Sequence, residues 1–363
     1  MKKVLIMFLI ILLVGCGNND DNLNIDNIPE IKKEPVISKI SMITAGDVLI
    51  HDAVYKDAYV SDKTYDFTKM FLSIKELVKD YDLKFYNQET IIGGKGLGLS
   101  TYPRFNSPEE IADAMLEMGF NMVSLANNHT LDKGEKGVLN SFEYWNSKDV
   151  MVAGSYNSKE SRDKLNIQQI NGIKYTLLAY TTGTNGLTTS KDYLVNIYDE
   201  QQVKEDIERV KPYTDVIIVS MHWGVEYSNT PSKEQKQIAE YLSSLGVNVI
   251  IGTHPHVIQP IEFINDTLVI YSLGNFISAQ IGIDRLMGMM VSYDIVKEDD
   301  IIKIENVKAE LIYTYYKNFR KYYVYPFSEL NDNILPNYIN HYDKYSKIIK
   351  KYDGDNQIII NAY

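Results

Sequence analysis

Short apolar runs alternate along this chain with segments whose apolar residues recur at helical spacing. The runs are rich in Val and Ile, which predicts buried strands. They lie at residues 39–45, 84–87, 121–126, 150–153, 174–180, 215–221, 247–251 and 268–272. The helical spacing predicts helices at residues 71–81, 107–118, 135–146, 200–210, 230–245 and 336–350. This alternation predicts an α/β fold with a mostly parallel sheet under helical cover, in which the run at 174–180 can open a second sheet.

Two helix starts and two late strands complete the predicted framework. Ser107, with Pro108 and Glu110 after it, has the sequence of an N-cap with a capping box. Thr230 and Pro231 would cap the helix that ends near residue 245. Residues 289–296 and 305–316 are expected to form antiparallel strands.

The N-terminus has the pattern of a secretory signal. Lys2 and Lys3 precede an apolar run at residues 4–14, which is too short to span a bilayer. The run ends in Leu13-Val14-Gly15-Cys16, which resembles a bacterial lipobox. That resemblance implies cleavage before Cys16 and acylation there, hence a lipid anchor on the extracytoplasmic face of the cell membrane. A plain secretory signal with an incidental cysteine is the alternative, which the position of this sole cysteine disfavours.

The net charge of the chain limits the classes of molecule that it can bind. The chain has 363 residues and a net charge of −11, and losing Lys2 and Lys3 would leave 35 of its 37 basic residues against 48 acidic ones, a net charge of −13. Such a surface disfavours nucleic acid as a partner. Residues 17–38 are polar and contain Pro29 and Pro35, so we expect a flexible tether there.

Five of the six histidines lie at or shortly after the ends of predicted strands, together with two acids and an amide. Carboxyl ends of parallel strands share one edge of a sheet, so these side chains can converge although they are far apart in sequence. They are nitrogen and oxygen ligands without sulfur, which suits Mn, Fe or Zn. Each residue taken alone fits a surface turn or a helix cap equally well. The set is Asp47, His51, Glu89, Asn128, His129, His222, His254 and His256.

Six motifs in this order carry a resemblance to a known family. They are GDVLIH (46–51), NQET (87–90), SLANNHTLDKG (124–134), MHWGVEY (221–227), GTHPHVIQPIE (252–262) and YSLGNFI (271–277). Together they resemble the CapA (poly-γ-glutamate capsule biosynthesis) family, a distant relative of the calcineurin-like metallophosphoesterases. The resemblance covers about residues 40–276. It implies a four-layer αββα sandwich of metallophosphatase type that binds two divalent metal ions.

The same resemblance implies how the ligands divide. Asp47, His51 and His256 would hold one metal ion. Asn128, His222 and His254 would hold the other, Glu89 would bridge the two ions, and His129 would be the general acid or a transition-state stabiliser. Two features depart from the wider phosphoesterase pattern: the first pair is Asp-x-x-x-His, and the bridging residue is Glu.

Four further residues are candidates for the site. Asp132 would orient the ring of His129, or simply cap the helix that follows Gly134. Arg104 and Glu226 are candidate substrate contacts, with a surface salt bridge as the alternative for each. Asn275 is grouped with them, and would either hold a ligand loop by hydrogen bonds or form a turn.

We expect a domain at residues 39–300 and a Tyr-rich extension at residues 301–363 that packs on it.

Three functions stay open from the sequence. The first function is a metal-dependent hydrolase or transferase acting on poly-γ-glutamate or a related anionic envelope polymer. The second is a non-catalytic component that binds the polymer or membrane proteins of capsule synthesis. The third is an unrelated binding module without metal.

Overall fold

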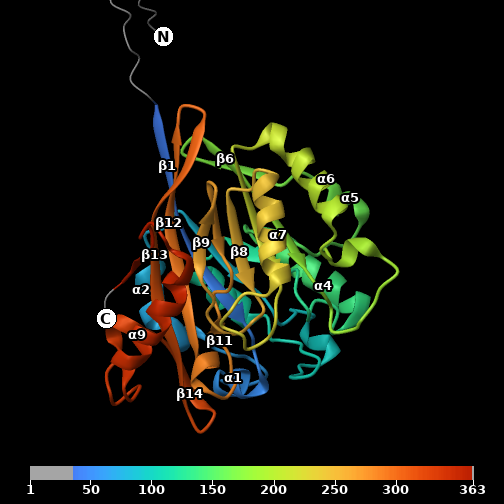
Figure 1. The fold of residues 1–363 in the computed structure, drawn as a ribbon. Coiled ribbons are helices and arrows are strands. Elements are labelled where there is room, and N and C mark those ends of the chain that lie inside the picture. Colours follow the sequence, from blue (N-terminus) through green and yellow to red (C-terminus); the bar gives the residue numbers. More distant parts are fainter. Residues whose placement is uncertain (1–35, 362–363) are drawn as a thin grey trace, which may run out of the picture. The chain divides into compact units, whose positions relative to one another are not determined.

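Two β-sheets lie face to face, with helices on their outer faces, in the computed structural model, which describes residues 36–361 (Figure 1). A first core lies between the sheets and takes side chains from both, among them Met42 and Phe85 from one and Ile218 and Ile251 from the other. A second core lies between the first sheet and its helices, and a third lies between the second sheet and its helices. The layers are therefore helix, sheet, sheet and helix, which confirms the predicted αββα sandwich.

The first sheet joins a parallel half to an antiparallel half at β1. Its strands run in the order β14-β13-β12-β1-β2-β3-β4, with β11 beside β1 and β15 beside β13. The bounds are β1 (Ile37–Val48), β2 (Leu83–Asn87), β3 (Met122–Ser124), β4 (Met151–Ala153), β11 (Asn275–Ile277), β12 (Met287–Glu298), β13 (Ile301–Lys317), β14 (Arg320–Pro326) and β15 (Ile359–Ile360).

The second sheet has four central parallel strands and an antiparallel strand at each edge. Its order is β5-β6-β7-β8-β10-β9. The strands are β5 (Ile167–Ile170), β6 (Ile173–Thr181), β7 (Val216–His222), β8 (Val249–Thr253), β9 (Ile261–Ile264) and β10 (Thr267–Ile270). The run expected at 174–180 does begin the parallel part of this sheet.

The helices supply the outer layers. α2 and α3 contribute to the core on the first sheet, and α6 and α7 contribute to the core on the second. None of the helices within residues 36–361 has the length and apolar character needed to cross a bilayer. The bounds are α1 (Asp52–Asp57), α2 (Leu72–Val78), α3 (Glu110–Glu117), α4 (Gly134–Asn146), α5 (Lys159–Asp163), α6 (Glu200–Val210), α7 (Lys233–Ser244), α8 (Ile283–Leu286) and α9 (Tyr338–Ile349).

Both predicted helix caps are wrong. α3 begins at Glu110 without a side-chain cap, because the hydroxyl of Ser107 donates a hydrogen bond to Thr90 Oγ1 (2.7 Å) instead. α7 is capped by Ser232, which forms a capping box with Gln235, and not by Thr230. Both helices still form, although Ser107 bonds outside α3 and the cap of α7 lies two residues after the predicted one.

The segment expected as an extension at residues 301–363 is part of the fold. β13 pairs along its length with β12, and β14 pairs with β13. Residue 300 therefore falls in the turn of a long hairpin. Residues 1–35, including the expected signal peptide, Cys16 and most of the tether at residues 17–38, lie outside the described residues.

Candidate metal centre

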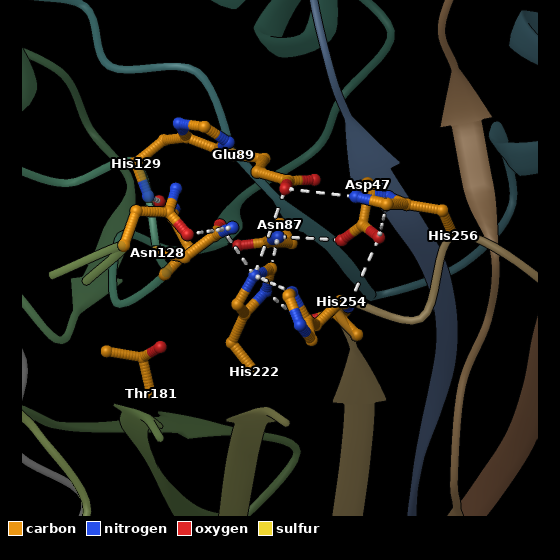
Figure 2. Close-up of polar contacts among 12 residues, drawn as sticks. Asp47, Asn87, Glu89, Asn128, His129, Thr181, His222, His254 and His256 are labelled. Atoms are coloured by element: carbon orange, nitrogen blue, oxygen red, sulfur yellow. Dashed lines mark hydrogen bonds and ion pairs between the residues drawn. The ribbon is translucent and has the colours of Figure 1, made fainter. Parts of the chain in front are cut away.

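Strand ends from both sheets deliver polar side chains to one place (Figure 2). Asp47 lies at the end of β1, and Glu89 follows β2. From the second sheet, His222 ends β7, and His254 and His256 follow β8. The carboxyl ends of parallel strands thus form the site in both sheets, as the sequence predicted.

The pairing of β1 with β2 organises the acidic side of the site. Asp47 lies opposite Asn87 in the sheet, and Asn87 Nδ2 donates a hydrogen bond to Asp47 Oδ1 (2.8 Å). The other oxygen, Oδ2, accepts from the backbone N–H of His254 (3.2 Å) and lies 3.3 Å from His256 Nδ1. Asp47 therefore links the two sheets at the centre of the cluster.

Glu89 is fully buried, yet neither of its carboxylate oxygens has a hydrogen-bond partner among the described residues. Its Oε1 atom lies 3.6 Å from His256 Nε2 and 3.8 Å from His222 Nε2. Burial raises the pKa of this carboxyl well above its usual range. Since a buried polar group without partners is costly, a cation ligated by this carboxyl group would supply the partner that the described residues do not.

His222 and His254 form the second part of the cluster. The Nε2 atom of His222 lies 3.0 Å from Asn128 Oδ1 and 3.1 Å from His254 Nδ1. Burial lowers the pKa of His222 well below its usual range, and it lowers that of His254 to about 4. Both rings are therefore neutral at pH 7 and have a lone pair to offer a metal ion.

His256 differs from its neighbours in charge. Burial alone would lower its pKa, but the nearby carboxylates of Glu89 and Asp47 outweigh burial and raise the pKa to about 9. Its Nδ1 atom lies 3.0 Å from Asn275 Oδ1. In the metal-free protein, the proton on His256 therefore occupies the place where a cation would balance the same two acids.

The His254-Pro255-His256 turn is strained. His254 has φ 95° and His256 has φ 58°, both in a region that non-glycine residues rarely adopt. Such strain costs of order 1–3 kcal/mol for each residue and gathers at functional sites. The turn brings two imidazoles onto one cluster, with ring centroids 6.0 Å apart, and the rings of His222 and His254 are 4.7 Å apart.

The residues present fit divalent cations. One ligand atom each of Glu89, His254 and His256 lie within 4.8 Å of one another. Glu89 stands between the Asp47–His256 pair and the Asn128–His222–His254 group, because it approaches a histidine of each. Glu89 thus lies where a carboxylate that bridges two metal ions would lie. Nitrogen and oxygen donors of this kind suit Mn, Fe or Zn.

His51 lies at the edge of this cluster. Its Nδ1 atom is 3.2 Å from the backbone oxygen of Leu49 and 3.3 Å from the backbone nitrogen of Ala279. Burial lowers its pKa to about 4. Within residues 36–361 it makes no hydrogen bond to Asp47 or His256, so direct ligation by His51 stays a prediction.

His129 and Asp132 form a buried pair beside the cluster. His129 Nδ1 lies 2.7 Å from Asp132 Oδ2, which also accepts the backbone N–H of Phe105 (2.6 Å). The ring of Phe105 packs edge-on against that of His129 at 4.7 Å. Because Asp132 engages Nδ1, the Nε2 atom of His129 is the one left for a substrate, which favours the orienting role for Asp132 over the capping role.

A cavity of about 490 Å³ opens beside the cluster. Arg104 and Glu226 line it together with His51, His129 and His256, and their contact with a substrate stays a prediction. Asn275 does not line it. That side chain is buried behind His256 and bonded through both its oxygen and its nitrogen, so the structure gives it the role of holding the ligand loop.

Sequence reasoning missed three residues of this region. Asn87 bonds Asp47, Thr253 Oγ1 lies 3.0 Å from His222 Nδ1, and Tyr227 lines the cavity. Asn87 and Thr253 end strands next to predicted ligands, so their positions were the available signal. Tyr227 had a weaker signal, since it directly follows Glu226 in a quoted motif.

The two stacked sheets, with polar side chains gathered at their strand ends, define an α/β fold of the metallophosphatase type. A solved structure described as a putative 5′-nucleotidase from Staphylococcus aureus in complex with alpha-ketoglutarate has a similar fold, with a TM-score of 0.51 and 17% identity over 75% of this chain and 54% of that chain. This likeness concerns the fold.

The chain belongs to the family described as bacterial capsule synthesis protein PGA_cap, whose model matches residues 41–280. The PGA biosynthesis protein CapA of Bacillus subtilis (strain 168) is 31% identical over 175 residues, which cover 47% of this chain and 46% of that protein. The capsule biosynthesis protein CapA of Bacillus anthracis is 26% identical over 263 residues, covering 67% and 60%. The matched regions thus span about half of the length of these relatives.

Proposed function

We propose that this protein is a lipid-anchored, metal-dependent enzyme of the outer cell surface that cleaves or transfers poly-γ-glutamate or a related anionic envelope polymer. The observation that carries the proposal is Glu89, a fully buried carboxylate without a hydrogen-bond partner among the described residues, set between two groups of histidines. The capsule role of the family supplies the substrate class. The sequence around Cys16 supplies the anchor.

The ligand groups divide around Glu89 in this proposal. Asp47 and His256, with His51 beside them, would hold one cation, and Asn128, His222 and His254 would hold the other. Two divalent cations, when bound, supply Lewis acidity and a water molecule of lowered pKa.

The chain's own groups would handle the proton and the substrate. Asp132 keeps His129 Nδ1 engaged, so Nε2 of His129 can hold a proton for a leaving group at the cavity. Arg104 lines the same cavity and offers a fixed positive charge to an anionic substrate. Phe105 packs against His129 and excludes water from one side of its ring.

Cleavage of a defined polymer tests this function. Full-length protein loaded with Mn²⁺ should shorten poly-γ-glutamate, as followed by size-exclusion chromatography. His129→Ala should abolish the shortening, whereas His341→Ala should not, because His341 lies in α9 away from the cavity. A fully metallated protein that leaves the polymer intact would refute catalysis on this substrate.

A second candidate function is polymer binding without turnover during capsule export. The descriptions of the family and of its Bacillus relatives concern synthesis of the capsule, which favours such a role. It predicts retention of the polymer on the metal-loaded protein at constant chain length. The same chromatography separates the two functions.

A further inference from the structure

Arg285 is placed beside the cavity by the residues that hold the ligand turn. Asn275 Oδ1 lies 3.0 Å from His256 Nδ1, and the same side chain donates from Nδ2 to the backbone oxygen of Arg285 (2.8 Å). Arg285 lies in the short helix α8 (Ile283–Leu286), between β11 and β12. One buried amide therefore fixes the backbone of Arg285 relative to His256.

The guanidinium of Arg285 lies over an aromatic ring of the cavity wall. Its central carbon is 4.3 Å from the ring centroid of Tyr227, which lines the cavity and lies 6.2 Å from the ring of His256. The backbone N–H of Tyr227 donates to the oxygen of Pro255 (2.8 Å), within the ligand turn. Both members of the stack are thus tied to the residues that would hold the metal ions.

Tyr227 adopts a backbone conformation that supports a functional role. Its φ is 65°, in the left-handed region, although it is neither glycine nor asparagine. The residue is 46% exposed, so core packing does not account for the conformation. The hydroxyl of Tyr227 accepts a hydrogen bond from Gln280, which also lines the cavity.

The positive charge of Arg285 has no acidic partner in the described part of the chain. Arg162 and Arg209, by contrast, both pair with Asp206. The neighbouring Asp284 is engaged by Lys344 and Tyr345 instead. In a chain with a net charge of −11, an unpaired arginine stacked on an exposed tyrosine is available to an anion from outside.

The geometry points to an anion subsite at Arg285 and Tyr227, which binds a second negatively charged group of the substrate outside the metal centre. This inference rests on the proposed function and makes the substrate a polyanion, with carboxylates on successive units. One unit would lie at the metal centre and a flanking carboxylate would reach the guanidinium. An arginine stacked on an aromatic ring loses little freedom when it binds such a group.

Binding of a labelled γ-linked oligoglutamate of about ten units to Mn²⁺-loaded, full-length protein tests the subsite. Arg285→Gln should weaken binding about tenfold at low salt, as expected for losing a charge-assisted hydrogen bond. Arg320→Gln, in the β13–β14 hairpin, should change it less than about twofold. The difference should shrink in high salt and vanish for the methyl-esterified oligomer.

The tyrosine offers a matched pair of variants. Tyr227→Phe keeps the ring under Arg285 and should bind like wild type, whereas Tyr227→Ala should resemble Arg285→Gln. Equal binding by Arg285→Gln and Arg320→Gln would overturn the subsite, and so would a wild-type protein that does not bind the oligomer at low salt. Cleavage is measured separately. A failure of the subsite, seen as equal binding by the two arginine variants, can therefore be told apart from a failure of the proposed catalysis, seen as an absence of cleavage.

Discussion

The Oδ1 atom of Asn275 lies 3.0 Å from the Nδ1 atom of His256. An amide oxygen can only accept, so the Nδ1 atom of His256 carries a proton and donates it to Asn275, while Nε2 lies 3.6 Å from Glu89. Outer partners of this kind set the tautomer and orientation of a metal-binding histidine. Asn275 is thus a positioning residue, and its effect should appear in metal affinity.

Replacing Asn275 with Ala should lower the affinity for Mn²⁺ about 10- to 100-fold, because His256 loses the contact that orients it. Competition against a fluorescent chelator measures this affinity. Asn157→Ala, at an exposed bend, is the control and should bind as wild type. Unchanged affinity in Asn275→Ala would show that His256 is oriented by its other contacts.

Replacing Asp132 with Asn should reduce polymer cleavage by about 10²-fold or more and leave the metal content unchanged. The amide can still accept from the N–H of Phe105, but it stabilises a charged His129 far less than a carboxylate does. Rates and metal content are measured on the same sample. Loss of metal in parallel with activity would assign Asp132 a structural role.

Glu310 makes the stability of the protein depend on pH. Burial raises its pKa from 4.5 to about 7, so the folded state binds the proton more tightly than the unfolded one. Proton binding by Glu310 therefore contributes to the free energy of unfolding. The contribution is fully present below pH 4.5 and is lost as the pH rises through 7.

Glu310→Gln should therefore be more stable than wild type at pH 8 by an amount on the order of 2–3 kcal/mol, with a smaller difference at pH 5. Urea denaturation at both pH values measures it. Glu305→Gln, an exposed position on the same strand, should show no such dependence. If the free energy of unfolding of the wild type changed no more between pH 5 and pH 8 than that of Glu310→Gln, Glu310 would not have a raised pKa.

Gly46 allows β1 and β11 to approach closely just before Asp47. A Cβ atom there would lie 1.9 Å from the backbone oxygen of Gly274, so Gly46→Ala must displace a strand. We expect a loss of about 1–3 kcal/mol in the free energy of unfolding. Gly96→Ala has open space around it and should be nearly neutral; equal denaturation midpoints for the two variants would contradict the close approach.

The sequence predicted the core strands and the polar side chains that gather at their ends, because each depends on a local pattern. β7 and β8 are continuous apolar runs that end directly at His222 and near His254. Asn87 was missed because its role depends on lying opposite Asp47 in the neighbouring strand, a relationship that no local pattern contains. The sequence left the role of Asn275 open between holding a ligand loop and forming a turn for the same reason, since its partner His256 comes from another loop.

The Tyr-rich C-terminal strand escaped prediction for a different reason. In β14, Tyr322 and Val324 are buried while Tyr323 and Tyr325 are partly exposed. Aromatic residues on both faces hide the alternation of polar and apolar positions that marks a strand. The strand became visible only through its pairing with β13.

The most direct test of the account is anomalous X-ray diffraction at the manganese edge from crystals of the protein grown with Mn²⁺. We predict about two anomalous peaks for each chain, one on either side of the Glu89 carboxylate and roughly 3.5–4 Å apart. Absence of any peak within bonding distance of Glu89, in crystals that contain Mn²⁺, would contradict a metal centre at this site.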